Sequence, residues 1–128
     1  MNVNRSSEAA PTRIGPGRNR RVIHTDHLMM ALIDFEDGPA ANPDPPHSHP
    51  HEQLTCVAAG EILFFIEGES CRLGPGDMIA VPPDRPHAIQ LLTAHARLID
   101  TFTPLRRDFL IHATAGKPMI ISPPAAPR

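Results

Sequence analysis

The sequence has no tryptophan and no tyrosine, and it contains five phenylalanines among 128 residues. Proteins that bind single-stranded nucleic acids stack the bases on aromatic rings along a positively charged groove. Here the formal net charge is −2 and the basic residues are scattered along the chain, so neither requirement is met. We therefore expect no nucleic-acid partner.

Long hydrophobic runs are also absent, although 41% of the residues are hydrophobic. A membrane-spanning helix needs about 20 consecutive apolar residues, and a secretory signal peptide needs an apolar stretch near the N-terminus. The opening residues, MNVNRSSE, lead into no such stretch. The sequence thus predicts a cytoplasmic protein with no membrane partner.

Cysteine is sparse, and the two cysteines, Cys56 and Cys71, do not have the spacing of a metal site. Both lie in segments that read as strands. In a chain without an export signal, reduced thiols are the expected state. We assign these residues no chemical role.

Proline, in contrast, is abundant, and 16 prolines with 8 glycines divide the chain into segments too short for long helices. The hydrophobic pattern places strands at residues 28–35, 54–58, 62–66, 70–73, 78–81, 87–92 and 96–102. Turn sequences at residues 67–69 and 74–77 would join neighbouring strands as hairpins. Many short strands separated by such turns predict an all-β sandwich or barrel.

The length suffices for one domain with one hydrophobic core, and not for two. Residues 1–19 are polar with Gly, Pro and Arg, and residues 116–128 are rich in proline. We expect these two tails to stay outside the barrel, either mobile or lying over a partner subunit. The barrel itself is predicted to span residues 20–115.

A metal site is indicated by the segment PPHSHPHEQ, in which His47, His49 and Gln53 share one parity. Side chains two residues apart leave an extended strand on the same face, so these groups can converge on one ion. A further imidazole follows at His87, after the apolar run 78–81. Neutral imidazoles and an amide oxygen suit a divalent ion, and they do not discriminate among Zn, Ni, Fe, Mn and Cu.

Two neighbouring residues leave the ligand set open. His51 has the parity of the other ligands, but Pro50 favours a bulge or a strand edge. The register would then break, and His51 would turn towards the pocket rim or into a position that supports a ligand. The same break could exchange Glu52 for Gln53 and give a site of three histidines and one glutamate.

These motifs resemble those of the cupin superfamily. The first cupin motif has two histidines two residues apart, then Glu or Gln, then Gly, and the second has a Pro-Gly-Asp turn and a closing histidine. The resemblance covers residues 20–112 and implies the double-stranded β-helix barrel, a jelly-roll-like fold. The matching residues are His47, His49, Gln53 and Gly60 in the first motif, and residues 75–77 and His87 in the second.

One acidic residue falls within an apolar row of the last expected strand. One face of this strand carries Ala96, Leu98, Asp100 and Phe102. If this face lines the barrel, Asp100 is buried and prepared for proton transfer, whereas the opposite orientation exposes it to solvent. The residues alone leave both orientations open.

A longer resemblance favours the inward orientation. Residues 100–109, DTFTPLRRDF, are similar to the motif Asp-x-Phe-Ser-Pro-Pro-Arg-x-Asp-Phe of the pectin-degradation branch of small cupins. That branch opens the ring of 4,5-unsaturated uronates to give linear keto acids. The resemblance implies that Asp100 moves protons, that Arg106 holds the carboxylate of an acidic sugar, and that Phe102 walls the pocket.

Three functions follow, in order of preference. The first is a metal-dependent, isomerase- or lyase-like enzyme that acts on a small sugar acid. The second is a non-haem metal-dependent oxygenase, and the third is a non-catalytic module that binds a metal or small ligand.

Apolar residues on both faces of 62–66 indicate a covered sheet. Small cupins commonly pair through one sheet, so a homodimer is expected.

Overall fold

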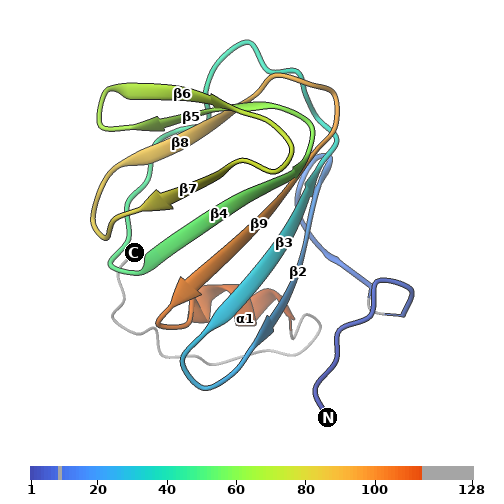
Figure 1. The fold of residues 1–128 in the computed structure, drawn as a ribbon. Coiled ribbons are helices and arrows are strands. Elements are labelled where there is room, and N and C mark those ends of the chain that lie inside the picture. Colours follow the sequence, from blue (N-terminus) through green and yellow to red (C-terminus); the bar gives the residue numbers. More distant parts are fainter. Residues whose placement is uncertain (9, 114–128) are drawn as a thin grey trace.

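The computed structural model describes residues 1–8 and 10–113, and these form two antiparallel β-sheets and one short helix (Figure 1). The six-stranded sheet has the order β1-β2-β3-β9-β4-β7, and the three-stranded sheet has the order β6-β5-β8. This arrangement confirms the predicted all-β architecture. In chain order the elements are β1 (Thr12–Gly15), β2 (Arg18–His24), β3 (Met29–Phe35), β4 (Glu52–Ala59), β5 (Ile62–Ile66), β6 (Glu69–Leu73), β7 (Met78–Val81), β8 (His87–Leu91), β9 (Ala96–Thr103) and α1 (Arg107–Ala113).

Every strand expected from the sequence is present, with ends that differ by at most a few residues. The turn at 67–69 joins β5 and β6 as a hairpin, as predicted. The turn at 74–77 does not form a hairpin, because β6 pairs with β5 whereas β7 pairs with β4 in the other sheet. That prediction was wrong because a turn sequence defines where the chain bends, but not which strand it pairs with next.

The N-terminal region also departs from the prediction. β1 pairs with β2, and β2 pairs along its whole length with β3, so the sheet begins at Thr12. The expectation that residues 1–19 stay outside the barrel is therefore wrong for residues 12–19. Charged residues at both parities of the run RNRR hide the alternation that would reveal a strand.

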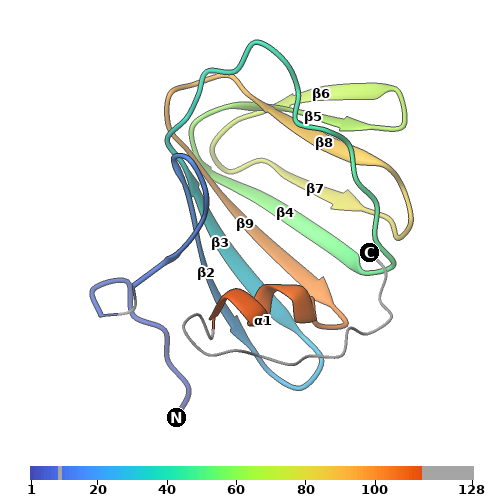
Figure 2. The same cartoon turned by 180° about the vertical axis from the view of Figure 1, so that it is seen from behind.

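The C-terminal end of the predicted barrel also differs, because it contains a helix that the sequence did not predict. α1 contributes Phe109, whose ring meets that of Phe102 edge-on with centroids 5.5 Å apart. Figure 2 shows α1 beside the ends of β9, β3 and β2.

No helix in the described ranges is long and apolar enough to cross a membrane. The predicted C-terminal tail, residues 116–128, lies outside the described residues.

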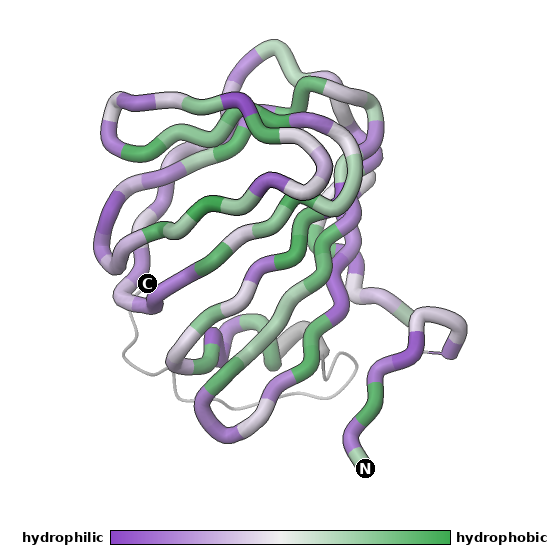
Figure 3. Tube along the Cα trace, in the orientation of Figure 1, coloured by the Kyte–Doolittle hydropathy of each residue, from purple (hydrophilic) through white to green (hydrophobic). Residues whose placement is uncertain are grey.

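The interior of the barrel is divided into an apolar end and a polar end. Hydrophobic and hydrophilic residues alternate along the strands (Figure 3), so each strand turns one set of side chains inward. Along β4 and β9 the inward residues also change in character from one end to the other. The paired inward residues are Gln53 with Phe102, Thr55 with Asp100, and Val57 with Leu98.

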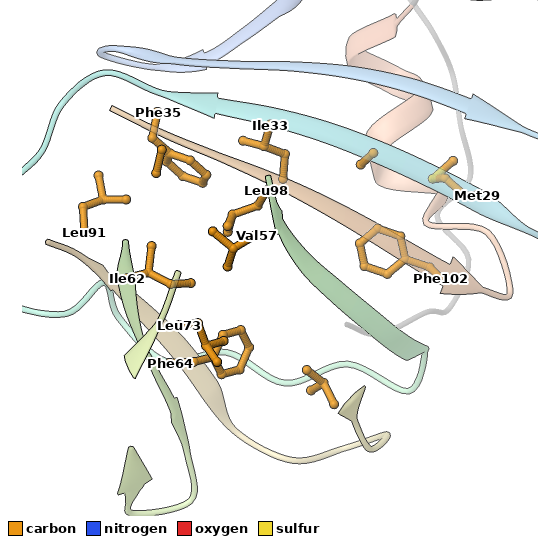
Figure 4. Packing of buried hydrophobic residues seen from close by; sticks show 13 residues of the cluster. Met29, Ile33, Phe35, Val57, Ile62, Phe64, Leu73, Leu91, Leu98 and Phe102 are labelled. Carbon is orange, nitrogen blue, oxygen red and sulfur yellow. The ribbon is translucent and has the colours of Figure 1, made fainter. Parts of the chain in front are cut away.

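The apolar end joins the two sheets. In Figure 4, Leu91, Ile62 and Phe35 gather at one end of the core, whereas Phe102 and Met29 lie towards α1. Full burial of a side chain of this size stabilises the folded state by about 1.5–3 kcal/mol. The closed apolar end therefore holds the sheets together, and the polar groups collect at the end nearer α1.

Gly60 occupies a turn between β4 and β5 that admits no side chain. Its φ is +76°, and an added Cβ would clash with the carbonyl oxygen of His95. We expect Gly60→Ala to lower the free energy of unfolding by at least about 2 kcal/mol, because a left-handed backbone and a clash both oppose the methyl group. Urea unfolding followed by circular dichroism measures this loss.

Gly68 provides the matched control, because its φ is +88° and nothing lies within 4 Å of an added Cβ. Gly68→Ala should therefore lower the free energy of unfolding only by the cost of the left-handed backbone, about 1 kcal/mol. Equal losses in the two variants would contradict the role of the close approach to His95.

Candidate functional site

At the polar end of the barrel, the loop between β3 and β4 is hydrogen-bonded to the start of β8 and to the connection that precedes it. The backbone N–H of His47 donates to the carbonyl oxygen of His87 at 3.0 Å, and the N–H of His87 donates back to His47 at 2.9 Å. Close by, the N–H of Asp84 donates to the carbonyl oxygen of His49 at 2.8 Å. These bonds bring the histidine-rich segment between β3 and β4 against the start of β8.

The result is a cluster of three imidazoles. Ring centroids lie 4.3 Å apart for His47 and His87, and 4.9 Å apart for His49 and His87. The nitrogen atoms that could bind a metal lie within 4.8 Å of one another. The structure thus brings together the three histidines that the sequence motif singled out.

Both ring nitrogens of His49 lie against oxygen acceptors. Its Nδ1 lies 3.2 Å from the carbonyl oxygen of His51, and its Nε2 lies 3.0 Å from Oε1 of Gln53. The amide nitrogen of Gln53 donates to Thr55 at 2.8 Å, which directs Oε1 towards His49. A neutral imidazole has one N–H, so when Nδ1 donates to His51 the Nε2 lone pair faces another acceptor. These two acceptors repel unless a cation binds both.

His87 has a similar arrangement. Its Nδ1 donates to the carbonyl oxygen of Arg85 at 2.8 Å. Its Nε2 is buried and makes no hydrogen bond within the described part of the chain. A backbone carbonyl on one ring nitrogen, with the other nitrogen presenting a lone pair, is the usual arrangement of metal-binding histidines. His47, His49, His87 and Oε1 of Gln53 therefore fit a divalent metal ion.

The electrostatics keep these imidazoles neutral at pH 7. Loss of hydration lowers the pKa of His47 to about 4, with further lowering by His87 and Arg106. The pKa of His49 is also lowered to about 4, first by burial and then by Arg106 and His87. Burial lowers the pKa of His87 as well. Neutral imidazoles keep the lone pairs that a metal requires.

The structure also resolves the alternatives around Gln53. β4 begins at Glu52, so the predicted break after Pro50 is present. Gln53 is buried and faces the histidines, whereas Glu52 is exposed on the outer face. His51 is buried, with Nε2 3.1 Å from the carbonyl oxygen of Leu105, and it supports His49 through its own carbonyl oxygen.

Asp100 lies on the inner face of β9, as the inward reading of that strand requires. Its Oδ1 accepts a hydrogen bond of 2.7 Å from the hydroxyl of Thr55, which links it to Gln53. Burial raises the pKa of Asp100 to about 6, although the Thr55 hydrogen bond and the charge of Arg106 oppose the rise. A carboxyl group with this pKa can accept and release protons near neutral pH.

These groups share one cavity of about 410 Å³ between the two sheets and α1. The predicted site residues in its lining are His47, Gln53, His87, Asp100, Phe102 and Arg106. Imidazole, carboxyl and guanidinium groups thus face one cavity large enough for a small molecule.

Arg106 and Phe102 lie at the α1 end of this cavity. Arg106 donates from Nε and Nη2 to the two carboxylate oxygens of Asp108, at 3.1 and 2.8 Å. Its guanidinium group also lies over the rings of Phe109 and Phe102, at 4.4 and 5.6 Å from their centroids. Phe102 is 2% exposed, and its ring meets that of His49 edge-on. Phe102 therefore separates the metal-binding end from α1.

A family model described as a cupin domain matches residues 34–102. The chain belongs to the cupin family. It is 38% identical over 99 residues to the pectin degradation protein KdgF of Dickeya dadantii, a match covering 76% of this chain and 87% of the relative. This likeness confirms the predicted branch within the family.

Solved structures agree with this assignment. The structure of KdgF from Halomonas sp. is 32% identical, with a TM-score of 0.74, and the match covers 81% of this cupin and 95% of that chain. An RmlC-like cupin from Shewanella frigidimarina is also 32% identical, with a TM-score of 0.76 and coverage of 85% and 96%. The predicted double-stranded β-helix fold is confirmed.

Several residues that line this cupin's cavity were not expected from the sequence, and two of them lie beside Arg106. These two are Arg20 and Phe109, from β2 and α1. Phe109 falls within the branch motif, so its place in the motif could have drawn attention to it. Arg20 carries no such signal, because its segment did not read as a strand.

Proposed function

We propose that this cupin is a metal-dependent enzyme that opens the ring of 4,5-unsaturated uronates and converts them into linear keto acids. The observation that carries this proposal is the cavity lined by two imidazoles of the three-histidine cluster, a buried carboxyl group and an arginine. The likeness to KdgF, a pectin degradation protein, supports a sugar acid as the substrate. Uronates are the acidic sugars of pectin.

His47, His49, His87 and Gln53 would hold one divalent metal. When bound, such an ion polarises a substrate oxygen as a Lewis acid. Nitrogen donors with one amide oxygen leave Zn, Ni, Fe, Mn and Cu as possible ions. Metal analysis of the purified protein would identify which one it carries.

Asp100 would move the proton. In the proposed reaction its carboxylate accepts the proton of the anomeric hydroxyl while the bond between C1 and the ring oxygen breaks. The electron pair of that bond stays on the ring oxygen, which gives an enolate whose double bond is the former C4–C5 double bond, while C1 becomes an aldehyde. Return of the proton to C4 gives the keto acid, so the product is an isomer of the substrate. A pKa of about 6 suits both transfers near neutral pH.

Arg106 would hold the substrate carboxylate. A guanidinium fork matches a carboxylate in charge and shape, and Asp108 occupies two of its five N–H donors. Phe102 would form the wall that keeps water from the reacting atoms. Replacement of Arg106 should therefore raise KM for the acid.

A proton NMR time course tests the reaction. A 4,5-unsaturated galacturonate is incubated with the metal-loaded protein, and the vinylic signal is followed against the spontaneous rate. We expect the protein to accelerate loss of the signal, and a chelator to abolish the acceleration. No acceleration by protein that demonstrably carries metal would refute the proposed reaction while leaving the metal site intact.

The outer face of the six-stranded sheet supports a homodimer. Met30, Leu54 and Met78 are 47%, 61% and 76% exposed, and they project from β3, β4 and β7. The register places Thr101 of β9 between Met30 and Leu54, and Leu54 opposite Ala80 of β7. Exposed apolar side chains on three strands of one sheet face are typical of an interaction site. We propose that two copies pair through this face.

Leu54→Lys should convert the dimer into a monomer, because it places a charge in the centre of the proposed interface. Light scattering coupled to size exclusion measures the mass. The matched control is Val3→Lys, which alters a residue that is 51% exposed outside this sheet and should leave the mass unchanged. A monomeric wild-type protein, or a dimeric Leu54→Lys variant, would exclude this interface.

A further inference from the structure

Arg20 lies on the inner face of the barrel, where an apolar residue would be expected. It pairs in register with Ile33 of β3, and Ile33 pairs with Leu98 of β9. The residue is 8% exposed and lines the same cavity as Arg106 and Asp100. Arginine is almost never buried to this extent without a partner for its charge.

Among the described residues no carboxylate forms a hydrogen bond or salt bridge with Arg20, although Asp108 lies near enough to interact with its charge. Nη2 of Arg20 is buried and makes no hydrogen bond there, and its guanidinium group lies 3.6 Å over the ring of Phe109. Burial lowers the pKa of Arg20 to about 10, a fall that Asp108 opposes and Arg106 reinforces. The side chain therefore stays charged at pH 7 in a poorly hydrated position.

The two other arginines that line this cavity are both paired with carboxylates. Arg18, two residues earlier on the same face of β2, donates to both Asp37 and Asp44. Arg106 donates through two nitrogens to Asp108. Arg20 has no equivalent carboxylate in the described part of the chain. A buried cation without an ion partner is costly, and an anionic ligand in the cavity would remove that cost.

We propose that Arg20 binds the carboxylate of the substrate together with Arg106. Both guanidinium groups lie over the Phe109 ring, so they occupy one region of the cavity wall. Arg20 and Arg106 place two guanidinium groups at this wall, and the carboxylate of Asp108 bonds Arg106, so a substrate carboxylate there can pair with Arg20. The inference rests on the proposed function for the identity of the acid, and it names the residue that selects acids over neutral sugars.

The burial of Arg20 explains why the site would bind acids more tightly than neutral sugars. A neutral sugar would leave the guanidinium unpaired and would displace whatever water reaches it, whereas a carboxylate satisfies it. Hydrogen bonds to charged groups contribute about 1.5–3 kcal/mol, which corresponds to roughly a 10- to 150-fold change in affinity. We expect the affinity for an acidic sugar to exceed that for the matching neutral sugar by a factor in this range.

The test compares two probes that differ at C6, D-galacturonate and D-galactose. Full-length protein loaded with diamagnetic Zn²⁺ is titrated with each sugar by NMR. The wild type should prefer the acid. Arg20→Met should weaken galacturonate binding by about 10-fold or more and change galactose binding by less than about threefold. Arg21→Met is the matched control, since it removes the same charge from the outward side chain that bonds Asn4, and it should alter neither affinity.

Thermal unfolding separates ligand binding from a structural role. Arg20→Met should unfold at the same temperature as the wild type or higher, because it removes a buried, unpaired charge. A lower unfolding temperature with equal losses for both sugars would assign Arg20 a structural role and overturn the inference. If the methionine variant does not fold, Arg20→Lys decides, because it keeps the charge without the planar fork and should still weaken galacturonate binding selectively.

Two further outcomes would also overturn the inference: unchanged galacturonate affinity in the Arg20 variant, or a wild type that binds both sugars equally. Both can be read without any turnover. A wild type that prefers galacturonate but does not open unsaturated uronates would contradict the proposed reaction and leave the assignment of Arg20 standing.

Discussion

Replacement of His87 with alanine is expected to weaken metal binding by more than about 100-fold and to reduce turnover to the spontaneous rate. Loss of a group that merely supports a ligand typically costs 10- to 100-fold in metal affinity, so loss of a ligand itself should exceed that range. His87 is the member of the cluster whose Nε2 is buried without a hydrogen-bond partner among the described residues. This nitrogen is therefore available to bind a cation in the cavity.

Metal content after dialysis, and metal affinity by competition with a chromogenic chelator, measure the effect. His24→Ala serves as the control, because His24 also places Nδ1 against a backbone carbonyl, that of Thr25, but lies outside the three-histidine cluster. It should retain full metal content and turnover. Wild-type metal affinity in the His87 variant would show that the cluster is not the metal site.

Asp100→Asn is expected to reduce turnover by about 10²–10⁴-fold, the usual contribution of a general acid–base group, while metal content stays unchanged. Asparagine has the shape of aspartate and can keep a hydrogen bond to Thr55, but it cannot exchange a proton. The NMR time course and metal analysis together measure this separation. Loss of metal along with turnover would mean that Asp100 acts through the ligands instead.

The same substitution should stabilise the metal-free protein at neutral pH. The pKa of Asp100 is about 6 in the folded state against an ordinary value of 3.8. The folded state therefore binds the proton more tightly, and ionisation lowers stability as the pH rises from 3.8 to 6. Above pH 6 the ionised carboxylate lowers the free energy of unfolding by an amount of the order of 3 kcal/mol, and below pH 3.8 this loss vanishes. Asp100→Asn should thus gain stability over the wild type through this window.

Urea unfolding in the presence of a chelator, at pH 4 and at pH 7, measures the difference. Asp34→Asn is the contrasting control, because the hydrogen bonds from Arg97 lower the pKa of Asp34. Removal of that carboxylate should destabilise the protein at pH 7, and the loss should shrink as the pH falls through the pKa of Asp34. A pH-independent difference for Asp100→Asn would contradict the buried, protonatable carboxyl group.

The histidine pair at the head of the candidate metal site and most of the strands could be predicted because both follow from local patterns. The two-residue spacing of His47 and His49 places both side chains on one side of an extended chain, whatever that chain later packs against. The alternation of apolar residues likewise predicts where a strand runs and which face is buried. His87, which lies 38 residues after His49 in the sequence, was included as a further imidazole after an apolar run, and the resemblance to cupins supported that choice.

Other features depended on contacts between residues far apart in the sequence. The alternation around Asp100 allowed two orientations, and pairing with Thr55 in β4 is what places the carboxyl group inside. The turn at 74–77 has the composition of a hairpin, yet the chain there passes between sheets because β7 finds its partner in β4.

Arg20 is the clearest example of this division. In the sequence it belongs to a charged run with no alternation, which is typical of solvated segments. The tertiary structure buries it because β2 pairs with β3 and α1 covers that end of the sheet with Phe109. The sequence by itself determined which groups can bind a metal and where strands can form. Only the tertiary structure decided which charges lose their water, because burial depends on the partners that folding brings together.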